Sequence, residues 1–171
     1  LRRLPGIRHV FVASGIRHDL VMQDAQCGMQ FMDELVGHHV SGQLKLAPEH
    51  SDAEILGLMG KGGTEELLDF RERFFEITRR TGKKQFLTYY FIAAYPGSEE
   101  RHMHALRRFA AGELSISPEQ VQIFTPTPST YATLMYYTGI DPFTGEALFV
   151  ERNPRAKAKQ KADYPTYLHI Q

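Results

Sequence analysis

The residues best suited to bind a ligand lie where apolar runs of the sequence end. Ser14 and Arg17 follow one such run, and Lys45 and Glu49 lie at the end of the next. A hydroxyl, two cations and a carboxylate can hydrogen-bond hydroxyl or carboxylate groups of a small molecule. The sequence therefore predicts a ligand site that is built from several short loops.

Histidines offer a weaker alternative, a zinc site. His38, His39 and His50 form the most plausible histidine cluster, but their spacing matches no known ligand pair. His102 and His104 would point in different directions on a helix and could not share a metal. No residue of this chain is therefore assigned as a metal ligand.

A glycine-rich stretch, GLMGKGGT at residues 57–64, invites comparison with a phosphate-binding loop. That motif needs four residues between its first glycine and the Gly-Lys pair, and a hydroxyl residue directly after the lysine. Here two residues intervene, and Gly62 follows Lys61. The stretch is interpreted as a flexible loop between helices that lies away from the ligand site.

Four apolar, β-branched and aromatic runs predict buried strands, at residues 8–14, 42–47, 85–95 and 120–125. Helical sequence follows each run, so the strands should be parallel and joined by right-handed crossovers. An open sheet and part of a barrel both satisfy this pattern. In either architecture the loops at the carboxyl ends of the strands meet at one edge.

Helices are predicted near residues 24–36, from 64 to a stop at 81–82, and at 99–111 and 131–137. Two serines are predicted to cap helices. Ser51 would form a Ser-x-x-Glu capping box with Glu54, and Ser98 would precede the helix at 99–111.

The composition is that of one globular domain with no need for a polyanionic partner. The chain has 171 residues, 42% of them hydrophobic, and a formal net charge of zero. Basic residues are in excess only after residue 150. Residues 1–150 are therefore interpreted as the folded domain and 151–171 as a basic tail that need not be ordered, with nucleic-acid binding disfavoured.

The single cysteine, Cys27, limits both the redox chemistry and the compartment. One thiol cannot form an internal disulfide or hold a structural zinc or an iron-sulfur cluster. A reducing cytoplasm is the expected location. No apolar run approaches the roughly 20 residues that cross a bilayer.

Longer phrases carry a resemblance to a known family. The segments VASGIRHDL, HHVSGQLKLAPEH, KKQFLTYYFIAAYPGS and PEQVQIFTPTPSTYATLMYYTGIDPFTG are similar, in order and spacing, to the second half of the radical SAM domain of the YgiQ family. The resemblance implies an α/β fold: the C-terminal βα units, strands three to six, of a partial (βα)6 barrel. It also implies two cofactors, S-adenosylmethionine and a 4Fe-4S cluster.

The family binds its cluster through a Cys-x3-Cys-x2-Cys loop that this chain does not contain. The expected partner is therefore the N-terminal half of the radical SAM domain. The resemblance assigns polar residues to the ribose and methionine groups of S-adenosylmethionine, and strand and turn residues to its adenine. The residues assigned to this cofactor are Ser14, Arg17, Lys45, Glu49, Phe91, Ala93, Tyr95, Gly97 and Thr125.

Two functions remain open at this stage. The first is a fragment of a radical SAM enzyme that acts on an unidentified substrate and is inactive alone. The second is a non-enzymatic, split or degenerate binding module that contacts RNA through the basic tail. A strand at 8–14 would also leave an apolar edge along 10–13, which predicts self-association.

Overall fold

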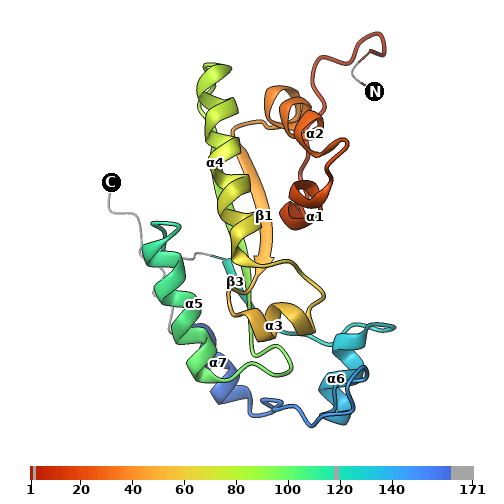
Figure 1. Ribbon diagram of the computed structural model, residues 1–171, viewed down its shortest axis with the longest axis vertical. Helices are drawn as coiled ribbons and strands as arrows, with labels where there is room; N and C mark the ends of the chain where they lie inside the picture. Colours follow the sequence, from red (N-terminus) through yellow and green to blue (C-terminus); the bar gives the residue numbers. More distant parts are fainter. Residues whose placement is uncertain (2, 118–119, 163–171) are drawn as a thin grey trace. The chain divides into compact units, whose positions relative to one another are not determined.

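The computed structural model describes residues 1, 3–117 and 120–162, which form two compact units. One unit comprises Leu1–Pro48 and Gly62–Tyr89, and the other comprises Glu49–Lys61 and Tyr90–Gln171. Strands β1 (Gln43–Glu49), β2 (Phe86–Ala93) and β3 (Gln120–Ile123) form a three-stranded parallel sheet in the order β1-β2-β3. The chain is thus a mixed α/β protein (Figure 1).

The first unit is built around its longest helix, α4 (Thr64–Arg80), with α1 (His18–Gln23), α2 (Gly28–Glu34) and the π-helical turn η1 (Leu35–His39). The prediction of α4 is confirmed. Its apolar residues recur three or four positions apart, so they form one buried stripe. The buried apolar residues of this stripe are Leu67, Phe70, Phe74 and Ile77.

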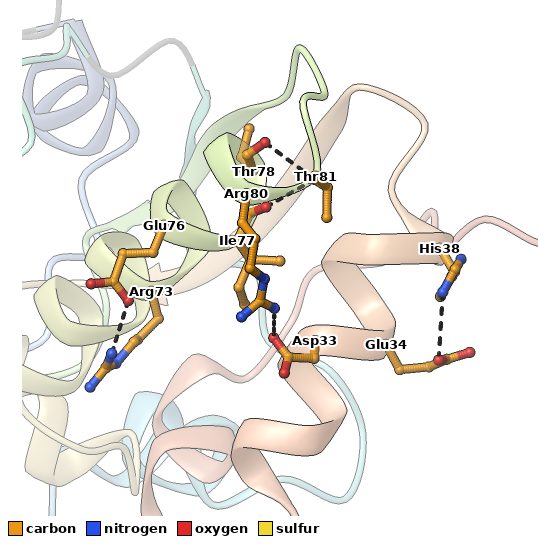
Figure 2. Close-up of polar contacts among 9 residues, drawn as sticks. All are labelled: Asp33, Glu34, His38, Arg73, Glu76, Ile77, Thr78, Arg80 and Thr81. Carbon is orange, nitrogen blue, oxygen red and sulfur yellow. Dashed lines mark hydrogen bonds and ion pairs between the residues drawn. The ribbon is translucent and has the colours of Figure 1, made fainter.

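The end of α4 is held by side chains that sequence patterns only partly indicate. The Thr81 hydroxyl donates to the carbonyl of Ile77 at 2.9 Å, and Arg80 pairs with Asp33 of α2 (Figure 2). Just beyond, the buried Gln85 amide donates to the carbonyls of Val36 and Val40 and accepts from Thr78. These bonds fix the start of β2 against η1.

The second unit contains α3 (Ala53–Leu58), α5 (Glu100–Gly112), α6 (Tyr131–Thr138) and α7 (Pro154–Ala162). Its part of the sheet pairs Phe91 of β2 with Val121 of β3, and both side chains are buried. The predictions of α5, α6 and the strands at 42–47, 85–95 and 120–125 are confirmed. None of the described helices combines the length and apolar character needed to cross a membrane.

The strand predicted at 8–14 is wrong. In the described part of the N-terminal segment, the residue that forms a β-bridge to β1 is Ile16, which pairs with Leu46 and lies beyond the predicted run. The backbone N–H of Val12 instead donates to the carbonyl of His39 at the end of η1. The apolar edge predicted at 10–13 is therefore not a strand, and self-association remains an untested prediction.

Local polar side chains also overturn three details of the helix predictions. Asp24 accepts from the backbone of Gln26 and Cys27, and because of this turn α2 begins at Gly28, later than the helix start predicted at residue 24. Helix α1, which precedes the turn, was not predicted. Asp52, not Ser51, caps α3. Glu99, not Ser98, is the N-cap of α5.

The first part of the basic tail is helical. Helix α7 carries Gln160, whose buried amide oxygen accepts the backbone N–H of Ala94 at 3.0 Å. Lys157 lies against the ring of Tyr136, and Lys159 pairs with Glu100. Two cations of the tail therefore contribute to packing within the second unit. Residues 163–171 lie outside the described residues.

Candidate functional site

The two faces of the strands differ in what they can offer a ligand. Tyr89, on the buried face of β2, hydrogen-bonds Arg71 of α4, so this face is covered by a helix. Side chains alternate between faces along a strand. On β1, Lys45 and Glu49 alternate with buried Leu44 and Leu46 and remain half-buried. A ligand could therefore reach Lys45 and Glu49.

An ion pair lies at the carboxyl end of β1, within the second unit. The Lys61 ammonium lies 3.6 Å from a carboxylate oxygen of Glu49. The lysine side chain is 6% exposed and the glutamate side chain 25% exposed. Lysine side chains are rarely this buried, because burying a charge is costly unless the charge is paired. Here Glu49 supplies the pairing charge.

The turn that places Lys61 is a Schellman motif at the end of α3. Gly60 has a φ of +62°, its N–H donates to the carbonyl of Gly57, and the Lys61 N–H donates to the carbonyl of Leu56. The stretch at 57–64 is thus a helix end, in agreement with its interpretation as a connection between helices. The expectation that it lies away from the predicted site residues is wrong, because Lys61 contacts Glu49.

Two tyrosines border the same carboxylate. Burial and the nearby charge of Glu49 raise the pKa of Tyr95 to about 12. The same two causes, in the same order, raise the pKa of Tyr90. The Tyr95 hydroxyl donates to the carbonyl of Leu58 at 3.2 Å. Both phenols therefore stay protonated near neutral pH and can act as hydrogen-bond donors.

The backbone around this site is held in unusual conformations. Glu49 has a φ of +67° and Ala94 a φ of +56°, and each ends or directly follows a strand. Gly97 has a φ of +89°, and a Cβ atom there would lie 2.5 Å from a methyl group of Leu58, so that Leu58 would have to move. Strained residues of this kind gather at functional sites.

The other predicted polar residues lie in the first unit. Ser14 is exposed, and the adjacent Gly15 packs against Ala47 and Lys45 of β1. Arg17 is engaged with buried Asp19, its Nε lying 2.8 Å from a carboxylate oxygen. Asp19 also accepts the backbone N–H of Gly62.

The Asp19 carboxyl is stabilised as an anion. Burial would raise its pKa, but the hydrogen bonds from Arg17 and from the Gly62 backbone, with the charge of Arg17, hold the pKa well below its usual range. Arg17 therefore has a structural partner within its own unit.

Two of the residues assigned to the adenine need a correction. The side chains of Phe91 and Ala93 are fully buried on one face of β2, so a ligand could meet only their backbone. Tyr90, on the opposite face, is partly exposed, whereas Ile92 packs against the cluster of Ile55, Tyr95 and Met135. Thr125 is exposed beyond β3, and its hydroxyl contacts the carbonyl of Ile123 at 3.4 Å.

Sequence patterns missed Lys61 as a site residue. The signal was present: a capped helix followed by glycine and lysine places the lysine just beyond the helix end. Its pairing with Glu49 depends on the positive φ of Glu49, which no sequence pattern indicates.

A group of possible metal ligands also occurs in the second unit. Ligand atoms of Asp52, Glu54 and His102 lie within 4.8 Å of one another. However, the Glu99 N–H donates to Nδ1 of His102 at 2.9 Å, and Nε of Arg101 lies 3.3 Å from its Nε2. Since Nδ1 accepts this bond, the neutral ring carries its proton on Nε2, which then has no lone pair for a metal. The His102 ring is therefore part of the capping box of α5.

His50, beside this group, is 1% exposed and accepts the backbone N–H of Asp52 through Nδ1. Burial lowers the pKa of His50 to about 4, with Asp52 opposing the shift and His102 adding to it. His38 and His39, the other members of the predicted cluster, lie beside Glu34 in the first unit.

Comparison with known proteins shows which proteins this chain resembles. The chain is 54% identical over 161 residues to UPF0313 protein FN0734 of Fusobacterium nucleatum, covering 94% of the chain and 28% of that protein. It is similar to the UPF0313 proteins. The UPF0313 family includes YgiQ. Relatives in Thermotoga neapolitana and Methanosarcina mazei are 46% and 41% identical over 94% and 95% of the chain, covering 28% and 25% of those proteins.

The chain therefore spans about a quarter of the length of the UPF0313 relatives that it matches. Residues 119–166 also match the family model described as "Domain of unknown function (DUF3362)". That match covers β3, α6 and α7.

Proposed function

We propose that this chain is part of a radical SAM enzyme and forms one side of its S-adenosylmethionine pocket, in a partial (βα)6 barrel. The observation that carries the proposal is the Glu49–Lys61 pair at the carboxyl end of β1. In parallel α/β folds ligands bind at this end of the strands. The resemblance to the radical SAM domain of the YgiQ family supports the same site.

The pair suits the methionine end of S-adenosylmethionine, which carries one ammonium and one carboxylate. Glu49 would accept from the ammonium or from a ribose hydroxyl, and Lys61 would donate to the carboxylate. Tyr90 would add a donor on the accessible face of β2. These residues bind and orient the cofactor and help to exclude water from it.

When bound beside a reduced cluster, the cofactor supplies hydrogen abstraction from a substrate. The described residues do not fit the cluster itself. Cys27 is exposed and is the single cysteine of the sequence, whereas three thiolates are needed. We therefore place the cluster in the N-terminal half of the radical SAM domain, which is the proposed partner.

The test joins this chain to the cluster-binding part of a UPF0313 relative and measures S-adenosylmethionine binding without oxygen. We expect Glu49→Gln and Lys61→Met each to weaken binding about ten- to a hundredfold, the usual effect of losing a charged hydrogen bond. Glu65→Gln, on an exposed position of α4, is the matched control. Unchanged binding in both site variants would refute the pocket.

Arg17 provides a second comparison. Its pairing with Asp19 means that Arg17→Ala should affect the stability of the first unit whether or not it touches the cofactor. A loss of binding by Arg17→Ala but not by Asp19→Asn would assign Arg17 to the pocket.

A further inference from the structure

Helix α6 carries both buried and exposed apolar side chains. None of its eight residues, YATLMYYT, is charged. Its inner face contributes Met135 to a cluster with Ile55 and Tyr95. The same helix exposes Tyr131, Leu134 and Tyr137, which are 62%, 46% and 67% exposed.

The turn after α6 adds another exposed apolar side chain. Phe143 is 71% exposed, and its ring centroid lies 4.7 Å from that of Tyr131. We call Tyr131, Leu134, Tyr137 and Phe143 the aromatic surface. Contiguous exposed apolar patches on soluble proteins mark interaction sites.

The backbone beneath the aromatic surface is already satisfied. The Arg152 guanidinium donates to the carbonyls of Tyr136 and Tyr137 at 3.0 and 3.1 Å, and Gly139 ends the helix in the left-handed conformation. A partner would therefore meet side chains rather than free backbone groups. None of the four side chains of the aromatic surface is charged, so the contacting face of the partner should be mainly apolar, with Asp141 and Glu146 at its edge beside Phe143.

We propose that the aromatic surface is covered by an apolar face of the polypeptide that UPF0313 proteins contain outside the span of this chain. Similarity to those proteins extends along 94% of the chain, yet the chain accounts for only 28% of the Fusobacterium relative. Most of such a protein is therefore available to bury this surface. The inference rests on the proposal that the chain works within a longer polypeptide, but not on the cofactor assigned to it.

The test is hydroxyl-radical footprinting, with mass spectrometry, of the chain alone and of a polypeptide in which it replaces the aligned segment of the Fusobacterium relative. We expect oxidation of Tyr137 and Phe143 to fall at least fivefold in the longer polypeptide. Phe91, which is buried, reports folding because it should be protected in both. This experiment involves no cofactor, so its result is independent of S-adenosylmethionine binding.

Two results would overturn the inference. One is unchanged oxidation of Tyr137 and Phe143 in the longer polypeptide while Phe91 stays protected. The other is protection in the isolated chain that grows with its concentration, which would make a second copy the occupant. If the joined polypeptide fails to protect Phe91, footprinting the intact Fusobacterium relative at its aligned aromatic positions decides between the same outcomes.

Discussion

The Lys61 ammonium and the Glu49 carboxylate lie 3.6 Å apart, at the two ends of the short segment that contains α3. The chain leaves β1 at Glu49, forms α3, and returns through the Schellman turn that ends in Lys61. The ion pair therefore joins the two ends of this segment. A ligand that engages either charge would act on a loop whose geometry is already fixed.

Replacing Lys61 by methionine should destabilise the protein by about 1 to 3 kcal/mol. The variant leaves the Glu49 carboxylate without its cation, although a quarter of that side chain remains exposed, so the cost should be below that of a fully buried pair. Urea unfolding at pH 7 measures the change. Lys61→Arg keeps the charge and should recover most of the stability. Equal stability of Lys61→Met and the parent chain would mean that the pair contributes nothing.

Gly97→Ala should destabilise the protein by about 2 kcal/mol or more. Its φ of +89° is strained for alanine, and the new methyl group would lie 2.5 Å from a Leu58 methyl group. Gly57→Ala, in neighbouring α3, is the matched control, because nothing lies within 4 Å of its Cβ position. That variant should gain up to about 1 kcal/mol. Thermal unfolding of both variants checks the contrast, which fails if they shift in the same direction.

Local sequence patterns predicted an element correctly where the signals that determine its structure lie within that element. Helix α4 combines a regular apolar stripe with acidic residues in its first turn and basic residues in its last. Each signal acts within a few residues, and together they fix the helix and the face that it buries.

Sequence patterns gave a wrong prediction where groups far apart in the sequence compete for the same hydrogen-bond partner. The run at 8–14 has the composition of a strand, but its Val12 N–H is taken by the carbonyl of His39. Strand formation depends on which partner is available, and composition does not encode the partner. Likewise, the alternation of side chains along β2 could be predicted. The face that α4 covers at Tyr89 depends on a contact with Arg71, which is distant in the sequence.

Asp19→Asn should cost about 2 to 3 kcal/mol at pH 7, the value of charged hydrogen bonds to Arg17 and Gly62. The folded state holds the pKa of Asp19 below the value of 3.8 that applies without these partners. Its stabilising effect is therefore complete above about pH 4 and is lost as the pH falls further. Denaturant unfolding of both proteins from pH 7 to pH 3 should show the difference shrinking. Asp69→Asn, exposed on α4, keeps the Asp19 contacts and is the control for replacing an aspartate by asparagine.

His50 should make the protein sensitive to mild acid. Burial lowers its pKa from 6.5 to about 4 in the folded state. As the pH falls below 6.5 the unfolded chain binds the proton first, so stability is complete above that pH and decreases down to about pH 4. The shift corresponds to a loss of roughly 3 kcal/mol.

His50→Gln removes the titrating group and isolates its effect from that of the carboxylates. We expect the stability of this variant, measured by urea unfolding between pH 7 and pH 4, to fall less steeply than that of the parent chain by about 3 kcal/mol in total. His9→Gln, at an exposed position of the first unit, keeps His50 and is the control for replacing a histidine by glutamine. Parallel curves for His50→Gln and the parent chain would mean that the folded protein accepts a proton at His50 as readily as the unfolded chain does.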